Sequence, residues 1–270
     1  MLGAIIGDII GSVYEWHNIK KTDFVLFDKE CTPTDDSVMS IAVADGLIRA
    51  WGKSQEEMKE SVIKSMQHYG RKYPNAGYGG TFRGWILMEE PMPYNSWGNG
   101  SAMRVSSVAW LYHDLHQVEN MAKLTAEVTH NHPEGIKGAQ AIAGATFLAR
   151  EHKSKEEIKS YVEENYQYDL DTTLDEIRTT YEFNESCQGS VPQAIRAFLE
   201  GESYEDAVRK AISIGGDSDT IACMTGAIAE AFFGIPEDIK KEGLSYMDSY
   251  LKRKLTAYYQ FLEANKRGNL

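Results

Sequence analysis

The sequence is poor in cysteine, in long apolar runs and in basic residues. Its 3 cysteines, Cys31, Cys187 and Cys223, lie far apart and form no CxxC pair. This excludes a disulfide framework and favours reduced thiols in a cytoplasm-like compartment. The apolar N-terminal stretch has no basic leader and runs straight into Asp8, so it predicts neither a signal peptide nor a membrane span. We therefore expect a cytoplasmic protein with no membrane partner.

Basic charge is also in deficit, because 28 Lys and Arg stand against 40 Asp and Glu, a formal net charge of −12. Proteins that bind the phosphate backbone of nucleic acids cluster Lys and Arg, so this balance argues against nucleic acid as a partner. A small anionic ligand is still compatible with the composition. Metal ions and helix N-termini can supply positive potential locally.

The chain shows no convincing alternation of strands and helices. Apolar residues recur at near-helical spacing from residue 36 to 50. Ser54 and Ser154 each stand three residues before a glutamate, a capping-box pattern that predicts a helix start. Small apolar residues predict a closely packed helix from 220 to 233. We expect a single all-α domain over residues 1–270.

The least helical segment runs from Tyr73 to Arg104, where glycine, proline and aromatic residues are dense. Long irregular stretches in compact domains are often functional. Trp85, Tyr94 and Trp97 could stack on a planar ligand, although ordinary packing explains them equally well.

Two acidic clusters lie far apart in the sequence, TDDS at residues 34–37 and GGDSDT at residues 215–220. An all-oxygen ligand set suits Mg²⁺ or Mn²⁺. Each cluster has a simpler explanation as helix caps, but neither explanation predicts the other cluster. Together they predict a metal site with these ligands: Thr34, Asp35, Asp36, Asp217, Asp219 and Thr220.

A third acidic motif, GDIIGS, occupies residues 7–12 and is followed by Glu15. Asp8 interrupts an apolar run, where a charge normally has partners. On a continuous helix Asp8 and Glu15 would share a face. The glycine-rich stretch at 97–104 could cradle a phosphate or form an ordinary turn. His130 and His132 are spaced poorly for a helical metal pair, and capping or packing is the commoner role.

Taken together, five segments resemble the ADP-ribosylglycohydrolase family and occur in its order: residues 7–12, 34–37, 98–104, 129–133 and 215–220. The resemblance implies a compact orthogonal helical bundle with two divalent cations, Mg²⁺ or Mn²⁺, at the base of a cleft. It implies that Thr34, Asp35 and Asp36 hold one cation, that Asp217 and Thr220 hold the other, and that Asp219 bridges them.

The same resemblance implies roles in the reaction. Glu15 matches a catalytic glutamate of serine-type members, and Asp36 and Asp219 would assist it as catalytic carboxylates. Substrate contacts fall to Gly79, Asn99, Gly100, Ser101, Met103 and His130. One position departs from the family pattern: arginine-type members often carry an aspartate where this chain has Gly80.

The predicted activity is metal-dependent hydrolysis of the glycosidic bond between ADP-ribose and a modified protein side chain. The bond is serine O-linked or arginine N-linked, or the substrate is a related ADP-ribose derivative, and Gly80 favours the O-linked and free forms. We expect a monomer. Two alternatives stay open, a catalytically silent ADP-ribose-binding protein and a binuclear-metal phosphohydrolase, but a full ligand set together with Glu15 favours catalysis.

Overall fold

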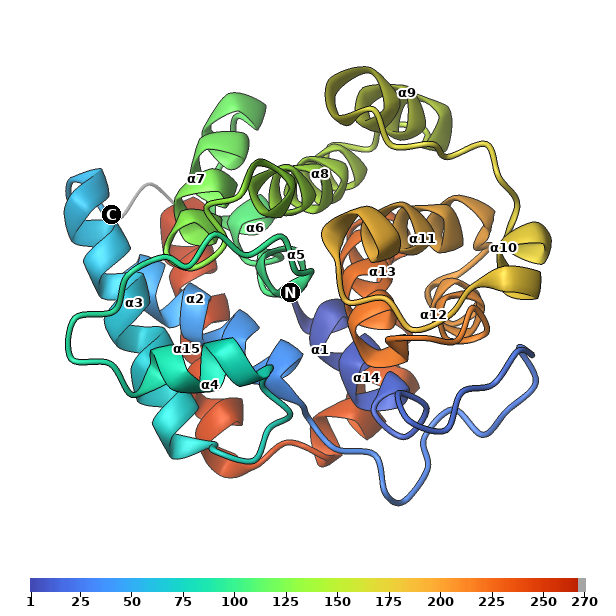
Figure 1. Ribbon diagram of the computed structural model, residues 1–270, viewed down its shortest axis with the longest axis horizontal. Coiled ribbons are helices and arrows are strands. Elements are labelled where there is room, and N and C mark those ends of the chain that lie inside the picture. The colour runs from blue at the N-terminus through green and yellow to red at the C-terminus, as the bar shows by residue number, and fades with distance from the viewer. Residues whose placement is uncertain (267–270) are drawn as a thin grey trace.

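In a computed structural model that describes residues 1–266, the regular secondary structure is helical (Figure 1). No strand occurs over residues 1–266, where a lone antiparallel bridge joins Gly98 to Ser186. The prediction of an all-α fold is confirmed. The helices are α1 (Leu2–Gly11), α2 (Asp35–Arg49), α3 (Gln55–Lys72), α4 (Gly80–Ile86), α5 (Gly100–Met103), α6 (Val108–Leu111), α7 (Leu115–Glu127), α8 (Pro133–Arg150), α9 (Lys155–Tyr166), α10 (Leu174–Thr180), α11 (Cys187–Glu200), α12 (Tyr204–Ile212), α13 (Ser218–Phe233), α14 (Glu237–Ser245) and α15 (Ser249–Lys266).

Local sequence signals place several helix starts. Ser54 and Ser154 form complete capping boxes at the starts of α3 and α9, as predicted. The small-residue helix predicted for 220–233 is α13. The segment from Tyr73 to Arg104 is less irregular than its composition suggests, because α4 forms inside it. Burial of one apolar face of α4 outweighs the two glycines in its sequence.

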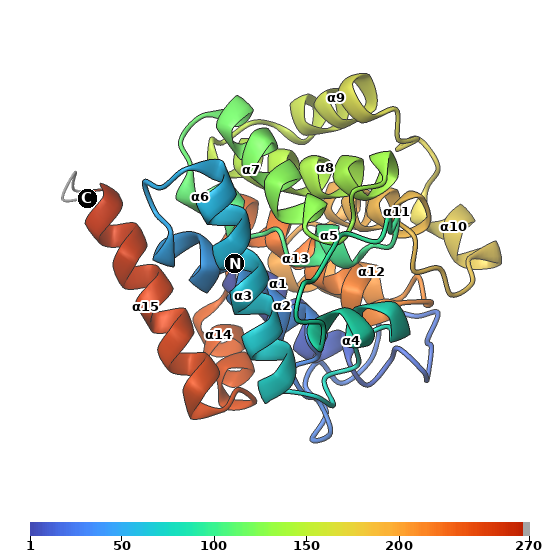
Figure 2. The same cartoon turned by 60° about the vertical axis from the view of Figure 1, so that its left-hand side comes forward.

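Helix α13 lies at the centre of the fold and packs against α1, α8, α11 and α12. Both ribbon views show α1 beside α13 (Figures 1 and 2). Every residue of α1 is buried, as are most residues of α13. A helix that is apolar on all sides belongs in the core of a large domain, which explains the missing polar face of α1.

Glycines set the close contact between α1 and α13. Gly3, Gly7 and Gly11 recur every four residues and so share one face of α1. A Cβ on Gly7 would lie 2.2 Å from the carbonyl oxygen of Ala222, and one on Gly11 would lie 2.5 Å from the Cα of Asp219. Only glycine lets the two backbones approach this closely, and the approach brings the end of α1 against the start of α13.

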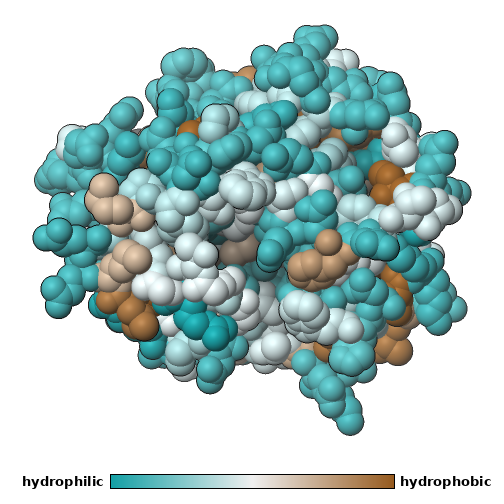
Figure 3. All heavy atoms as spheres, in the orientation of Figure 1, coloured by the Kyte–Doolittle hydropathy of each residue, from teal (hydrophilic) through white to brown (hydrophobic). Residues whose placement is uncertain are grey.

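Hydrophilic residues cover most of the face seen in the space-filling view (Figure 3). The large apolar side chains that stay exposed are few and mostly lie in loops: Trp16, Val25, Leu87, Met88, Met92, Trp97 and Phe183. Across the described part of the chain, no helix has both the length and the apolar character needed to cross a membrane.

Candidate active site and metal centre

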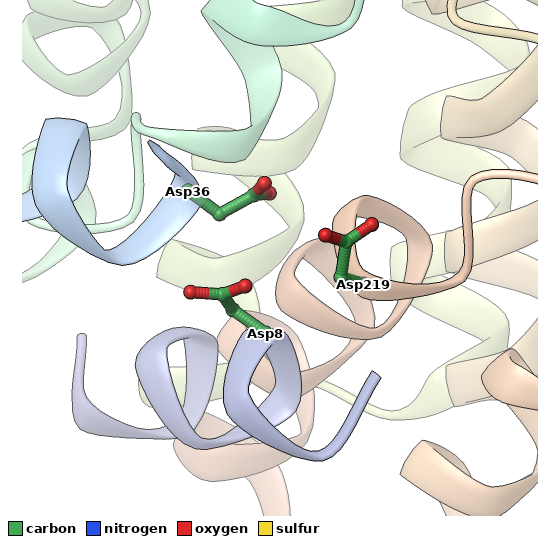
Figure 4. A group of neighbouring side chains, drawn as sticks. All are labelled: Asp8, Asp36 and Asp219. Carbon is green, nitrogen blue, oxygen red and sulfur yellow. The ribbon is translucent and has the colours of Figure 1, made fainter. Parts of the chain in front are cut away.

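Three helices bring acidic side chains from distant parts of the sequence to one point. Asp8 from α1, Asp36 from α2 and Asp219 from α13 point toward one another (Figure 4), with one carboxylate oxygen of each within 4.8 Å of the others. Glu15, Asp217 and Asp219 form a second group within the same limit. Among residues 1–266, Asp219 is the carboxylate that belongs to both groups.

The start of α2 is fixed by Asp8. Its carboxylate accepts hydrogen bonds from the Thr34 amide (3.0 Å), the Thr34 hydroxyl (2.6 Å), the Ser37 amide (3.0 Å) and the Ser37 hydroxyl. Thr34 is the N-cap of α2, and Asp36 follows in the first turn. Asp8 thus holds the helix end that presents Asp36. The site predicted from the sequence did not include Asp8, although the position of this charge in an apolar run indicated that its carboxylate has a partner in the folded protein.

The start of α13 depends on Gly215 and Gly216, whose φ angles are 76° and 72°. Residues that carry a Cβ rarely adopt this left-handed region, so the paired glycines permit a tight turn here. Asn18 clamps the turn: its Nδ2 donates to the Gly216 carbonyl (2.9 Å), and its Oδ1 accepts from the Gly216 amide (2.7 Å). The turn delivers Asp217 and Asp219 to the cleft.

Glu15 lies at the site, but it does not lie on the same helix as Asp8, contrary to the prediction from the sequence. Helix α1 ends at Gly11, so Glu15 lies in the following turn and does not share a helical face with Asp8. The glycine at the end of α1 packs against Asp219, and the chain turns away there. Glu15 is only partly buried, unlike Asp217 and Asp219 beside it.

Burial raises the pKa of the acidic groups in this cluster. It raises the pKa of Asp8 to about 6, that of Glu15 to about 7 and that of Asp35 to about 8. Repulsion from neighbouring carboxylates adds to the effect of burial at Glu15 and Asp35. The pKa of Asp36 and that of Asp219 rise well above their ordinary value, by burial first and by repulsion second. A cluster of this kind is unfavourable without compensating positive charge.

The donor set fits a hard divalent cation. Asp36 Oδ1 is buried without a hydrogen-bond partner among residues 1–266, while Asp36 Oδ2 accepts from the Thr220 hydroxyl at 3.1 Å. Asn99 Nδ2 donates to Asp217 Oδ2 at 2.7 Å and orients that carboxylate. Carboxylate and hydroxyl oxygens are the ligands that Mg²⁺ and Mn²⁺ prefer, and an ion would both occupy the unpaired oxygen and offset the repulsion.

A cavity of about 1090 Å³ opens over the acidic cluster. Its lining includes these residues predicted as metal, catalytic or substrate contacts: Glu15, Asp35, Asp36, Gly79, Asn99, Gly100, Met103, His130, Asp217, Asp219 and Thr220. Thr34 and Ser101 are not among the lining residues. The Thr34 hydroxyl faces Asp8, and the buried Ser101 hydroxyl donates to the Gly135 carbonyl at 2.7 Å.

Comparison with known proteins assigns this arrangement to a family. The sequence profile described as ADP-ribosylglycohydrolase matches residues 1–265. The chain belongs to the ADP-ribosylglycohydrolase family. ADP-ribosylhydrolase ARH3 of Homo sapiens is 29% identical over 312 residues, covering 88% of this chain and 85% of the relative. The Gallus gallus ADP-ribosylhydrolase ARH3 is 28% identical over 312 residues, covering 87% of this chain and 84% of the relative.

A solved structure confirms the fold of this ADP-ribosylglycohydrolase. A chain of an ADP-ribosylglycohydrolase-related protein complex superimposes with a TM-score of 0.63 at 21% identity, covering 91% of this chain and 95% of the other. At that identity the likeness concerns the fold. Family membership makes the chain a glycosyl hydrolase of a family that acts on ADP-ribosylated substrates, and this confirms the resemblance drawn from the five motifs.

Aromatic residues around the cleft of this ADP-ribosylglycohydrolase differ in whether their rings are exposed to a ligand. Trp85 is fully buried and packs on Phe82, so it cannot stack on a ligand. Trp97 lines the cavity with 54% of its surface exposed. Trp16 and Phe183 also line the cavity and stack on each other, with ring centroids 5.3 Å apart. Nothing in the sequence pairs these last two residues, because they lie in separate loops.

Proposed function

We propose that this ADP-ribosylglycohydrolase uses two divalent cations, Mg²⁺ or Mn²⁺, to hydrolyse the glycosidic bond between ADP-ribose and a modified protein side chain. The observation that carries the proposal is the sharing of Asp219 between two carboxylate groups at the floor of a cavity of about 1090 Å³. Asp35 and Asp36 would hold one cation and Asp217 and Thr220 the other, with Asp219 shared by both. The Thr34 hydroxyl donates to Asp8 and would have to leave that bond to join the first set of ligands.

When bound, the cations supply orientation of the ribose hydroxyls and a water of lowered pKa. The protein supplies the proton transfers. Burial and the neighbouring carboxylates raise the pKa of Glu15 to about 7, so near neutral pH both its protonated and its ionised form are populated. Partial exposure also lets Glu15 exchange its proton, unlike the fully buried Asp36 and Asp219. We assign Glu15 as the group that protonates the leaving atom and then accepts a proton from water.

The remaining carboxylates act on the sugar. Glycosidic cleavage passes through a state with positive charge on the anomeric carbon, which nearby negative groups stabilise. Asp36 and Asp219 are held rigidly in helical first turns and would stay close to that carbon throughout. This is a positional role, and it needs no proton transfer at either residue.

The far end of the cavity would hold the rest of ADP-ribose. Trp97 begins the glycine-rich stretch at residues 97–104, is exposed and lines the cavity. We propose that its ring stacks on adenine. Gly79, Asn99, Gly100, Met103 and His130 also line the cavity. Ser101 could contribute only through its backbone, since its hydroxyl is engaged with Gly135.

Position 80 favours an oxygen-linked or free substrate over an arginine-linked one. Gly80 lines the cavity, and a Cβ placed on it would meet no atom within 4 Å. A side chain there would reach into open space over the site. The carboxylate that arginine-type members often carry at this position is therefore missing from this cleft without a replacement at the same place. We propose serine O-linked ADP-ribose, or a free derivative of it, as the preferred substrate.

A release assay tests the proposal. Matched peptides carrying ADP-ribosyl-serine or ADP-ribosyl-arginine are incubated with Mg²⁺, with Mn²⁺ and with EDTA, and free ADP-ribose is measured. We expect metal-dependent release from the serine peptide. Binding of ADP-ribose without release from either peptide would favour the silent binding protein, and release of phosphate instead would favour the phosphohydrolase.

Glu15→Gln tests the assigned acid. The amide keeps the size of the side chain but cannot transfer a proton, so turnover should fall by about 100-fold or more while ADP-ribose still binds. Glu182→Gln is the matched control, because Glu182 is exposed and lies outside the cavity lining. A Glu15→Gln enzyme with wild-type turnover would remove Glu15 from the mechanism.

We further propose that the protein acts as a monomer in the cytoplasm and does not bind nucleic acid. All 3 cysteines are free and buried, and the net charge is −12. Light scattering at increasing concentration would test the monomer.

A further inference from the structure

His130 presents its two ring nitrogens to different surroundings. The side chain is only 5% exposed and forms part of the cavity wall. Its Nδ1 lies 2.7 Å from the hydroxyl oxygen of Thr129. Its Nε2 faces the glycine-rich loop, where a Cβ on Gly100 would lie 3.2 Å away and one on Gly98 3.5 Å away. No hydrogen bond to Nε2 is made by any residue from 1 to 266.

Arg104 determines the direction of the hydrogen bonds that the Thr129 hydroxyl makes. The guanidinium is buried, and its Nη2 donates to Thr129 Oγ1 at 2.7 Å and to the Thr125 carbonyl at 3.3 Å. A guanidinium can only donate, so Thr129 Oγ1 is the acceptor in this pair. The hydroxyl keeps its own proton to donate, and Thr129 is fully buried.

Among residues 1–266, His130 Nδ1 is the only acceptor within hydrogen-bonding distance of that proton. If Nδ1 carried a proton, the Thr129 hydroxyl would be left as a buried donor without an acceptor, which native structures avoid. The hydroxyl therefore donates to Nδ1, and the single proton of the neutral imidazole resides on Nε2. Burial and the nearby charge of Arg104 lower the pKa of His130 well below its ordinary value, which keeps the ring neutral.

We infer that Arg104 and Thr129 form a relay that fixes His130 as a neutral Nε2–H donor directed into the cleft, where it binds an oxygen acceptor of the substrate. The identity of the ligand as ADP-ribose rests on the proposed function. The relay itself rests on the contacts of three side chains.

Two consequences for recognition follow. A protonated Nε2 cannot ligate a metal ion or remove a proton, so His130 is a binding group and neither a metal ligand nor a base. A fixed donor also distinguishes between ligands. A ligand that places its own hydrogen-bond donor opposite Nε2 leaves two donors facing each other and binds less tightly. Thr129 does not line the cavity and is a positioning residue, and Arg104, which does line it, sets the preference through its hydrogen bond to Thr129.

The tautomer can be observed directly. Two-bond ¹⁵N–¹H correlation spectra of the full-length protein report which imidazole nitrogen carries the proton. For wild type we expect a protonated Nε2 and an unprotonated Nδ1 at His130. Thr129→Val keeps the shape of the side chain but removes the hydroxyl, so the ring should populate both tautomers. The dissociation constant for ADP-ribose should then rise by about fivefold or more, the loss expected for one hydrogen bond.

Thr129→Ser is the matched control, because it restores the hydroxyl and should restore both the wild-type spectrum and an affinity within about twofold. A proton on Nδ1 in wild type would overturn the relay, as would an unchanged tautomer and affinity in Thr129→Val. The wild-type spectrum decides the tautomer even if Thr129→Val does not fold. A wild-type protein that shows the expected tautomer but does not bind ADP-ribose would refute the proposed function and leave the relay intact.

Discussion

Raising the pH should destabilise the metal-free protein. In the folded state the pKa of Asp8 is raised from 3.8 to about 6 and that of Glu15 from 4.5 to about 7. A carboxyl group with a raised pKa binds its proton more tightly when folded than when unfolded. Its contribution is therefore complete below the unfolded value and is lost as the pH rises through the folded value. For these two groups the loss should span the range from about pH 4 to about pH 8, and Asp35, whose folded pKa is about 8, extends it to higher pH.

The size of the effect follows from the shifts. The pKa of Asp8 moves by about 2 units, and one unit corresponds to about 1.4 kcal/mol, so Asp8 contributes at most about 3 kcal/mol. The pKa of Glu15 moves by a similar amount, but its charge is partly exposed and screened by solvent, so its contribution is smaller than the shift alone gives. Because the carboxyls repel one another, their contributions do not add fully, and about 5 kcal/mol is a reasonable total for Asp8 and Glu15 together. That is comparable to the whole stability of many domains. For a chain of this size it corresponds to a fall of about 10 °C in Tm.

Thermal unfolding followed by circular dichroism tests this, in EDTA and in excess Mg²⁺ or Mn²⁺, at about pH 5 and about pH 8. The metal-free Tm should fall with pH, and the metal should raise Tm much more at the higher pH, where the ligands are ionised. Asp36→Asn should raise the metal-free Tm at about pH 8 and weaken the response to metal. The exposed Asp23→Asn serves as the control. A metal-free Tm that stays constant or rises over this range would refute the electrostatic account of the site.

Three further predictions, one of them with a matched control substitution, concern other parts of the structure. Asp219→Asn should lower turnover more than about 100-fold and reduce bound metal in elemental analysis, with an unchanged helical spectrum, because it changes the shared carboxylate; retained metal would exclude the sharing. Gly7→Ala should destabilise the fold by about 3 kcal/mol in urea titration, since its Cβ would lie 2.2 Å from the Ala222 carbonyl oxygen. Gly84→Ala, where a Cβ meets nothing within 4 Å, should not, and equal effects of the two would contradict the packing argument. Trp97→Ala should weaken ADP-ribose binding about tenfold in calorimetry if its ring stacks on adenine, and unchanged affinity would exclude stacking.

The sequence predicted best what depends on near neighbours. The capping boxes at Ser54 and Ser154 involve residues three positions apart, so their pattern determines the helix starts. The acidic clusters at the starts of α2 and α13 were expected together because neither made sense alone, and the structure brings Asp36 and Asp219 together.

The predictions from the sequence were wrong or incomplete where the course of the chain or tertiary packing determines the position of a residue. Periodicity put Glu15 on the face of Asp8, but α1 ends at Gly11 against Asp219, and nothing local shows that end. Asp8 was noticed as an unexplained charge, yet its role at the start of α2 depends on contacts about thirty positions further along, at Ser37. Burial of Trp85 depends in the same way on the packing of α4.

The acidic centre is assembled from the two halves of the chain, with Asp8 and Asp36 in one and Asp217 and Asp219 in the other. Ends so distant in sequence meet late in folding, because closing the intervening loop is slow compared with forming single helices. A chain still being synthesised carries Asp8 and Asp36 long before α13 exists. An unfinished molecule can therefore hold only half of the proposed metal ligands, and the capacity to cleave a glycosidic bond arises only once the whole fold is in place.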